Sequence, residues 1–238
     1  LHLSIRRQRQ MCIRDSCGRR DGPIAEEDPL PETGFANGYE ASKAAGERLV
    51  RASALDWAIA RPSIVVGASD TGAIRQFDTT YAAFKLIAEG RVRHMPARPS
   101  ASLDFVPIDH VARGIVELAE RMEAARGGTY HLVSVQPLAV ADFTATIGAY
   151  PHFHEPELVP PENFDATMLP ALERRLFRRV AGLYASYFQR DPHFGDDDFR
   201  AVTGLACPLT GSDYMKRLID YCIAAGFLAE PDAQRTSG

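Results

Sequence analysis

The chain has 238 residues, 45% hydrophobic and 24% charged, which is enough for one large globular domain or one domain with a small lobe. The formal net charge of -4 argues against nucleic-acid binding, which requires a basic face to neutralise phosphates. No apolar run approaches the roughly 18 residues of a membrane-spanning helix, so no membrane span is expected. The four cysteines include no CxxC pair, so neither secretion nor a structural zinc is indicated and a cytoplasmic protein is expected.

The opening segment differs from the rest of the chain in composition. Residues 1–20 read LHLSIRRQRQMCIRDSCGRR and contain six Arg against one Asp. The apolar stretch within them is too short for a signal peptide. The string resembles the translation of a sequencing adapter, so residues 1–16 are predicted to be a non-native segment and are left out of the fold prediction.

A helix is predicted after the Pro-, Gly- and acid-rich loop at residues 21–38. It reads GYEASKAAGERLV, and its alanines, with Leu49 and Val50, are expected to pack against a sheet. Tyr39 and Lys43 lie one helical turn apart on it and therefore share a face. A phenol beside an ammonium is a proton donor suited to carbonyl chemistry.

Strands and helices alternate over the next hundred residues. Residues 56–67 predict a buried strand ended by Pro62, which should leave backbone groups free of the ladder and able to bind a ligand amide. Residues 71–93 predict a helix closed by a glycine, and residues 129–134 a strand. This order favours an α/β fold with parallel strands.

A second amphipathic helix is predicted within residues 102–128, after a short extended piece. Asp109 is a plausible N-cap, which favours a structural role for this carboxylate over acid–base work with Asp104. Apolar residues then recur at helical spacing and are expected in the core. They are Val111, Ile115, Leu118 and Met122.

The proline-rich residues 150–162 predict a linker or lobe boundary, and helices are expected beyond it at 166–190 and 210–228. Residues 17–149 and 150–238 are therefore predicted to form two units. His152 and His154 have no further ligand cluster around them, so no metal site is expected.

A second Y-x-x-x-K match, Tyr81 and Lys85, has the same spacing as the first. Spacing cannot choose between the two pairs, but context can. Tyr81 is flanked by apolar residues typical of a buried helix face, which predicts a structural role. Tyr39 opens a helix that leads into a strand, where a cofactor would lie at the strand's C-terminal end.

Three ordered motifs resemble a known family. GYEASKAAGERLV, ARPSIVVGASDTG and LDFVPIDHVARGIVELA look like the second half of an extended short-chain dehydrogenase/reductase. They are most similar to the branch of fatty acyl-CoA (male-sterility type) reductases and carboxylic-acid thioester reductase domains. The resemblance covers residues 18–149 well and the remainder loosely. It implies part of a Rossmann-like, doubly wound parallel sheet, namely its C-terminal half, with a mostly helical C-terminal substrate lobe.

The resemblance also implies roles for individual residues. Tyr39 would protonate a developing alkoxide, and Lys43 would hold the nicotinamide ribose and lower the pKa of the phenol. The family's stretch against the nicotinamide corresponds to Pro62, Ser63, Ile64 and Val65. The physical chemistry agrees, because a cation within about 4–6 Å of a phenol favours phenolate. In GASDTGA, residues 67–73, no lysine follows the glycines, so a loop at the mouth of a substrate pocket is favoured over a phosphate loop.

Two family features are missing from the sequence. No G-x-x-G-x-x-G turn, which would hold the cofactor pyrophosphate, occurs anywhere in the chain. The Ser or Thr that precedes the tyrosine in the family would fall in the opening segment, where Ser16 is a poor substitute. We therefore expect an N-terminally truncated chain that is inactive by itself.

The predicted function is an NAD(P)-dependent oxidoreductase that transfers hydride between a nicotinamide and a carbonyl or acyl-thioester carbon. NADP(H) is favoured over NAD(H), because reductive members of the family mostly use it. One alternative is a nucleotide-sugar epimerase or dehydratase, and another is a non-catalytic member that binds or senses the cofactor. The sequence predicts a small-molecule or acyl-thioester substrate and leaves the oligomeric state open.

Overall fold

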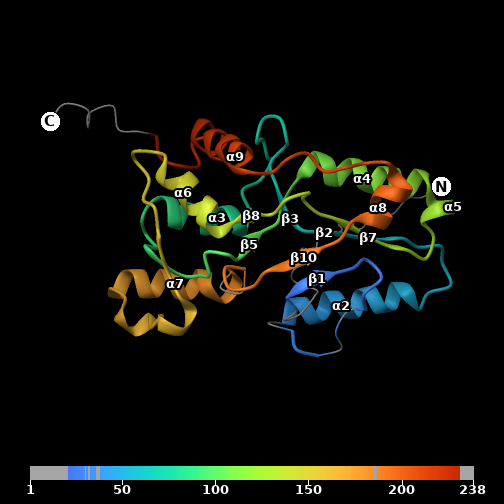
Figure 1. Cartoon of the computed structure of the whole chain (residues 1–238), viewed down its shortest axis with the longest axis horizontal. Coiled ribbons are helices and arrows are strands. Elements are labelled where there is room, and N and C mark those ends of the chain that lie inside the picture. The colour runs from blue at the N-terminus through green and yellow to red at the C-terminus, as the bar shows by residue number, and fades with distance from the viewer. Residues whose placement is uncertain (1–20, 30, 32, 36–37, 185–186, 231–238) are drawn as a thin grey trace.

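A computed structural model describes residues 21–29, 31, 33–35, 38–184 and 187–230. The predicted non-native segment and Ser16 lie outside these residues. Strands run through the middle of the molecule, with α2 (Gly38–Arg51) on one side and α4 (Ile108–Glu120) on the other (Figure 1). The fold is α/β, as predicted. Two further points stay predictions. One is that the strands are the C-terminal half of a larger sheet, and the other is that the chain divides into two units at residue 150.

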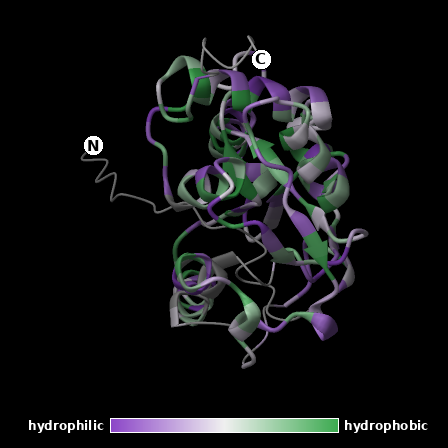
Figure 2. Cartoon of the chain, turned by 90° about the vertical axis from the view of Figure 1, so that its left-hand side faces the viewer, coloured by the Kyte–Doolittle hydropathy of each residue, from purple (hydrophilic) through white to green (hydrophobic). Residues whose placement is uncertain are grey.

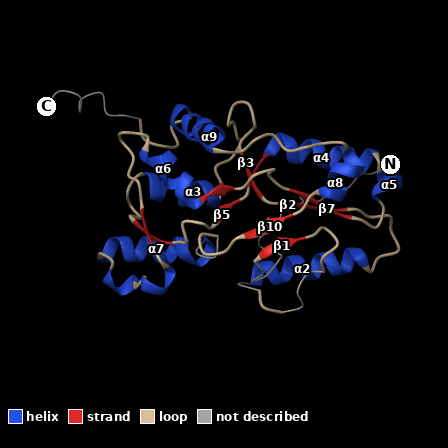
Figure 3. Cartoon of the chain, in the orientation of Figure 1, coloured by secondary structure: helices blue, strands red, loops and turns tan. Residues whose placement is uncertain are grey.

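The strands are short and pair mainly in parallel (Figure 3). All five strand pairs in the described residues join segments that are not adjacent in the sequence. Four of them are parallel and the fifth is antiparallel. The parallel pairs are β1 (Gly22–Ile24) with β10 (Pro192–Phe194), β2 (Ile59–Pro62) with β7 (Thr129–Leu132), β3 (Ile64–Val66) with β6 (Phe105–Pro107), and β4 (His94–Pro96) with β9 (Glu157–Val159). The antiparallel pair is β5 (Ser102–Leu103) with β8 (Leu138–Ala139).

Helices alternate with the strands through the first two thirds of the chain and dominate the last third. The α-helices after α2 are α3 (Thr79–Ala88), α4, α5 (Met122–Ala125), α6 (Val140–Gly148), α7 (Ala171–Tyr184), α8 (Asp197–Thr203) and α9 (Ser212–Ala224). Two short 3₁₀ turns, η1 (Pro161–Asn163) and η2 (Ala166–Met168), precede α7.

Two apolar clusters form the core, and the apolar segments concentrate inside the layers (Figure 2). The larger cluster lies among α3, α6 and α9, with Phe84, Phe143 and Ile219 as members. The smaller one joins β7 to α4 and α8 and includes Val111 and Phe199. Burial of this kind stabilises a fold by about 25 cal/mol per Å² of apolar surface.

The prediction of irregular or purely helical structure after residue 150 was wrong in two places. β9 lies inside the predicted linker, and β10 lies just beyond the predicted helix at 166–190. Both are three-residue strands whose partners are more than sixty residues away, so no local pattern marks them. The helix α7, predicted over residues 166–190, is shorter in the structure, where it runs from Ala171 to Tyr184.

Two predicted helix faces also differ from the structure. On α2, Ala44 and Glu47 are buried, whereas Leu49 and Val50 are exposed. On α4, Ile115 is 38% exposed and the glycine at position 114 takes its place against Phe199. On α4 the glycine allows Phe199 to pack closer to the helix than an isoleucine would. On α2 the buried carboxylate of Glu47 has a charged partner in Arg61.

Candidate functional site

The helix α2 carries the first Tyr–Lys pair. Positions 39 and 43 both lie in this one continuous helix, one turn apart. The side chain of Tyr39 lies outside the described part of the structure, and Lys43 is partly buried. The predicted roles of Tyr39 and Lys43 therefore stay predictions.

Strand β2 leads into the predicted cofactor stretch and ends at Pro62. The backbone N–H of Ser63 donates to the Leu132 carbonyl at 3.0 Å, and that of Ile64 donates to the Asp104 carbonyl at 3.0 Å. The N–H groups of Ser63 and Ile64 are therefore not free of the sheet, and the expected contact of Pro62, Ser63, Ile64 and Val65 with a cofactor stays a prediction. The side chain of Ser63 differs, because its buried Oγ has no hydrogen-bond partner among the described residues.

A second buried hydroxyl lies just beyond the end of the neighbouring strand β7. The backbone N–H of Ser134 donates to Asp104 Oδ1 at 2.8 Å, while its Oγ has no partner within the described ranges. Buried polar atoms are nearly always hydrogen-bonded, and an exception calls for an explanation such as an absent ligand. The Ser63 and Ser134 hydroxyls, at the carboxyl ends of adjacent parallel strands, fit a group with amide and hydroxyl functions such as a nicotinamide riboside.

A buried ion pair joins α2 to β2. Arg61 donates from Nε to Glu47 Oε2 at 3.1 Å and from Nη2 to Glu47 Oε1 at 2.6 Å. Only 2% of the Arg61 side chain and 4% of the Glu47 side chain are exposed. Arg51 donates from Nε to the same Glu47 Oε1 at 3.0 Å. One carboxylate therefore binds two guanidinium groups at the interface between the helix and the strand.

The imidazole of His131 supports Arg61 from strand β7. Its Nδ1 lies 2.8 Å from the Gly195 carbonyl, which can only accept, so the proton sits on Nδ1 in the neutral ring. Its Nε2 then faces Arg61 Nη1 at 3.4 Å as an acceptor. Burial and, after it, the charge of Arg61 lower the pKa of His131 to about 3, so the ring is neutral at physiological pH.

In the second Tyr–Lys pair, Tyr81 belongs to the larger core cluster, whereas the Lys85 side chain is 37% exposed. The Tyr81 hydroxyl accepts the backbone N–H of Gly67 at 2.9 Å, and burial raises the pKa of this phenol. Lys85 donates to the Phe227 carbonyl at 2.5 Å and pairs with Glu89 at 3.5 Å. The structural role predicted for Tyr81 and Lys85 is therefore confirmed.

The loop at residues 67–73 is packed tightly against its surroundings. A Cβ at Gly67 would lie 1.9 Å from the Gly72 carbonyl oxygen, so only glycine fits there. Ser69 donates to Asp109 from its backbone N–H at 2.8 Å and from its hydroxyl at 2.7 Å. Asp109 is thus not the N-cap of α4, a position that Pro107 occupies. Burial opposes ionisation of Asp109, but the two bonds from Ser69 prevail and its pKa is lowered.

An apolar cavity of about 60 Å³ lies beside β3, where the predicted cofactor stretch ends. Ile64 and Val66 line one side of it. Residues of α3, α6 and α9 line the rest together with Leu103, Tyr187 and Phe188, and no charged side chain takes part. Its lining includes Phe84, Phe105, Phe143, Met215 and Leu218. A pocket of this kind accommodates an apolar group and offers nothing to bind sugar hydroxyls.

The described residues offer neither a metal centre nor a membrane-spanning helix. No three histidine, cysteine, aspartate or glutamate side chains are grouped there so that they could hold a metal ion. Within the same residues, every helix is too short or too polar to cross a bilayer.

Sequence reasoning missed Glu47, Arg61 and His131. One signal was present, because Glu47 follows Lys43 by the same four residues that separate Lys43 from Tyr39. If the face that bears Tyr39 and Lys43 packs against a sheet, a carboxylate on that face needs a buried partner of opposite charge. Nothing local indicated that Arg61, inside an apolar strand, would reach it.

Comparisons with known proteins show a similarity to an NAD-binding family and to reductases. An NAD-binding family model described as male sterility protein matches residues 6–115, a range that begins inside the segment predicted to be non-native. Aldehyde reductase lnaA of Aspergillus flavus is 28% identical over 117 residues, which is 46% of this chain and 11% of that protein.

Two solved structures extend the likeness beyond the matched range. The terminal R domain from the myxalamid PKS-NRPS biosynthetic pathway is 25% identical with a TM-score of 0.76, covering 93% of this chain and 58% of that one. A thiolation-reductase di-domain from an archaeal non-ribosomal peptide synthetase has a TM-score of 0.62 at 19% identity, over 87% of this chain and 44% of that one. This chain therefore spans little more than half of the first structure and about a tenth of the curated relative.

Proposed function

We propose that this chain belongs to the NAD-binding family described as male sterility protein, whose model matches residues 6–115, and that it forms part of a reductase acting on a carbonyl or acyl-thioester carbon. It is related to reductase domains of biosynthetic assembly enzymes, as its structural neighbours indicate. A bound nicotinamide cofactor would supply the hydride. NADPH is the expected form, since the reaction is reductive.

The observation that carries the proposal is the arrangement of α2 and β2. The Tyr–Lys spacing lies in a helix that is joined by a buried ion pair to the strand entering residues 62–65. Tyr39 would hold the proton that a developing alkoxide takes up, and Lys43 would favour ionisation of that phenol by its charge. The Ser63 hydroxyl, buried and unpartnered among the described residues, would bind the cofactor amide.

The apolar cavity supports an acyl substrate over a nucleotide sugar. Its lining has no charged group, whereas sugar recognition requires hydrogen-bonding side chains around each hydroxyl. A substrate whose carbonyl lies near residues 62–65 could place its apolar substituent beside Ile64.

The test is a titration of NADPH and NADH, followed by product analysis with acyl-CoA and UDP-glucose. It uses the chain and, in parallel, the polypeptide encoded together with its upstream genomic DNA. We expect NADPH oxidation with acyl-CoA in at least the longer form. UDP-glucose turnover would contradict the acyl assignment, and cofactor binding without any turnover would indicate a non-catalytic member.

A pair of matched variants tests the cofactor contact. Ser63→Ala removes the unpartnered hydroxyl within the predicted stretch and should weaken NADPH binding several-fold. Ser53→Ala removes an exposed hydroxyl that donates to the Val50 carbonyl at 2.7 Å, outside that stretch, and serves as the control. Equal affinity of Ser63→Ala and the unmodified protein would remove Ser63 from the proposed site.

A further inference from the structure

The Glu47–Arg61 ion pair lies at the point where the two halves of the proposed site approach each other. Glu47 follows Lys43 by one helical turn on α2, and Arg61 directly precedes Pro62 on β2. The pair therefore spans from the helix with the predicted proton donor to the strand with the predicted cofactor contacts. Among the described residues, this ion pair joins the two elements through side chains that are buried on both sides.

The chemistry of the pair suits orientation better than it suits stability. Burying two charges costs each of them its hydration, so apolar residues of equal volume often stabilise a fold as well or better. A bidentate guanidinium–carboxylate contact, in contrast, fixes both distance and angle, because the planar fork meets both oxygens at once. The two bonds of 2.6 and 3.1 Å have this form.

Two neighbouring side chains, Arg51 and His131, hold the pair in place. Arg51 binds the same Glu47 oxygen and also contacts the Thr129 hydroxyl on β7. The neutral ring of His131 accepts from Arg61 while its other nitrogen donates to the Gly195 carbonyl. The network thus links α2 and β2 to β7 and to the segment after β10, so neither partner can swing away without breaking several contacts.

We propose that Glu47 and Arg61 are positioning residues that set α2, with Tyr39 and Lys43, at the correct height and rotation against residues 62–65. This inference rests on the proposed function. Neither residue needs to touch substrate or cofactor. A displacement of 1 Å between reacting groups can cost about a hundredfold in rate, so the fixed geometry of the pair bears directly on turnover.

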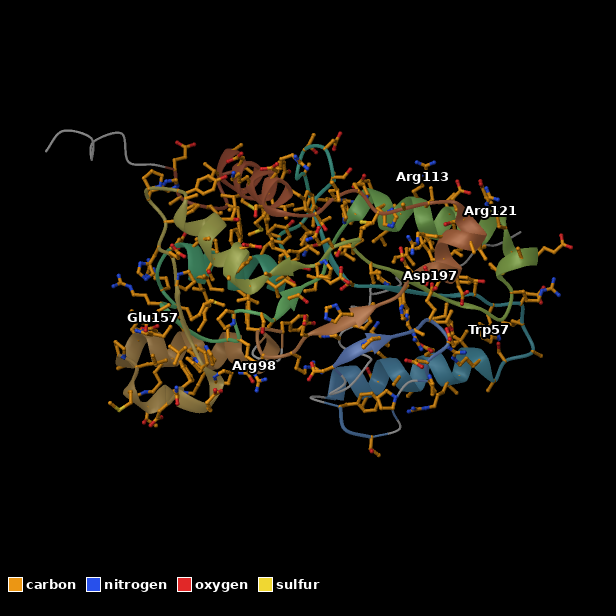
Figure 4. The ribbon with its side chains drawn as sticks, viewed as in Figure 1. Trp57, Arg98, Arg113, Arg121, Glu157 and Asp197 are labelled. Atoms are coloured by element: carbon orange, nitrogen blue, oxygen red, sulfur yellow. The ribbon has the colours of Figure 1, made fainter. Side chains whose placement is uncertain are left out.

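The test compares four variants. Glu47→Leu with Arg61→Met replaces the pair by apolar residues of similar volume and should preserve the fold. Arg61→Lys keeps the charge but loses the fork, and Glu47→Gln keeps the shape but loses the charge. Glu117→Gln is the control, since it breaks the exposed Glu117–Arg121 pair on α4, where the contact is 3.0 Å. Arg121, the partner of Glu117 in this control, lies on the opposite side of the strands from Trp57, which the next measurement uses as a probe (Figure 4).

Trp57 provides a local optical probe, because it is the sole tryptophan of the chain and Arg51 lies over its ring at 5.3 Å. In the double variant we expect an unfolding midpoint near that of the unmodified chain, a shifted Trp57 emission and at least tenfold faster amide exchange in residues 38–51. In the longer polypeptide that includes the upstream sequence, the kcat for NADPH oxidation should fall at least tenfold with KM nearly unchanged. Arg61→Lys should restore part of it.

A folded double variant with unchanged exchange in residues 38–51 and unchanged kcat would overturn the proposal. If the longer polypeptide, encoded together with the upstream genomic DNA, neither binds NADPH nor turns over, the proposed function is contradicted instead. In that case amide exchange and Trp57 emission still decide whether the pair positions α2. If the double variant does not fold, the same measurements on Arg61→Lys and Glu47→Gln replace it.

Discussion

The helices α2 and α3 carry the same Y-x-x-x-K spacing but are fixed to the molecule by different means. On α3 the face that bears Tyr81 is buried among aromatic and aliphatic side chains, with Phe77 edge-on to it at 5.4 Å between ring centroids. On α2 the buried side chains among the described residues are Ala44 and Glu47, and Glu47 pairs with Arg61 on the neighbouring strand.

This difference determines what each tyrosine–lysine pair can do. Burial stabilises the neutral phenol of Tyr81 and raises its pKa, which is the opposite of what a proton donor near neutral pH requires. Lys85 is engaged by Glu89 and the Phe227 carbonyl, not by the phenol. Spacing alone therefore does not identify a catalytic pair, and the way the helix is docked must be considered with it.

The largest expected difference between the helices is in turnover. Tyr39→Phe should lower kcat by about 10²–10⁴, the usual contribution of a positioned acid or base, without changing the unfolding midpoint. Tyr81→Phe should leave kcat per folded molecule nearly unchanged. Steady-state NADPH oxidation by the longer polypeptide that includes the upstream sequence, corrected for the folded fraction by circular dichroism, measures both. Equal losses in the two variants would remove the distinction between α2 and α3.

The two lysines should differ in cofactor affinity. Lys43→Met removes the charge expected near the nicotinamide ribose and should weaken NADPH binding by about tenfold, or about 1.4 kcal/mol. Lys85→Met leaves the cofactor affinity as it is, because its contacts lie with Glu89 and Phe227. Quenching or enhancement of NADPH fluorescence gives both dissociation constants. Unaltered binding in Lys43→Met would argue against α2 as the cofactor-facing helix.

The free energy of unfolding should show the reverse order, with a larger loss from the tyrosine of α3 than from that of α2. Tyr81→Phe leaves the Gly67 N–H, buried next to Tyr214, without its acceptor and should cost about 1–3 kcal/mol in the free energy of unfolding. Tyr221→Phe, which loses a partly buried bond to the Ile74 carbonyl, is the control and should cost less. Urea denaturation reports both values. A Tyr81→Phe variant as stable as the unmodified chain would mean that the core does not depend on this hydroxyl.

Much of this contrast could be predicted from the sequence. The apolar neighbours of Tyr81 and the alternation of strands and helices are local patterns, and both predictions are confirmed. The structural role of Asp109 was expected too, but with the wrong partner. It binds Ser69, forty residues away, in place of the amides of its own helix.

What the sequence could not provide depends on distant partners. β10 exists because Pro192–Phe194 lies beside Gly22–Ile24, and three residues carry too little periodicity to predict that pairing. Glu47 and Arg61 look like exposed charges in isolation, since charged residues are almost never fully buried unless paired. Only the crossing of α2 over β2 brings them together, and that crossing is set by the whole fold.

The smallest expected difference is in alkaline titration. The unfolded chain ionises Tyr81 near pH ~10, whereas burial keeps the folded phenol protonated above that value. Stability should therefore fall as the pH rises beyond ~10, by at most ~1.4 kcal/mol per pH unit for this group, and Tyr81→Phe should fall less steeply. Tyrosinate absorbance separates the helices further. Tyr39→Phe should remove a phenol that ionises reversibly in the folded protein, and Tyr81→Phe should not. Loss of reversible tyrosinate signal in Tyr81→Phe would show that its phenol is open to solvent, and the contrast between α2 and α3 would then fail.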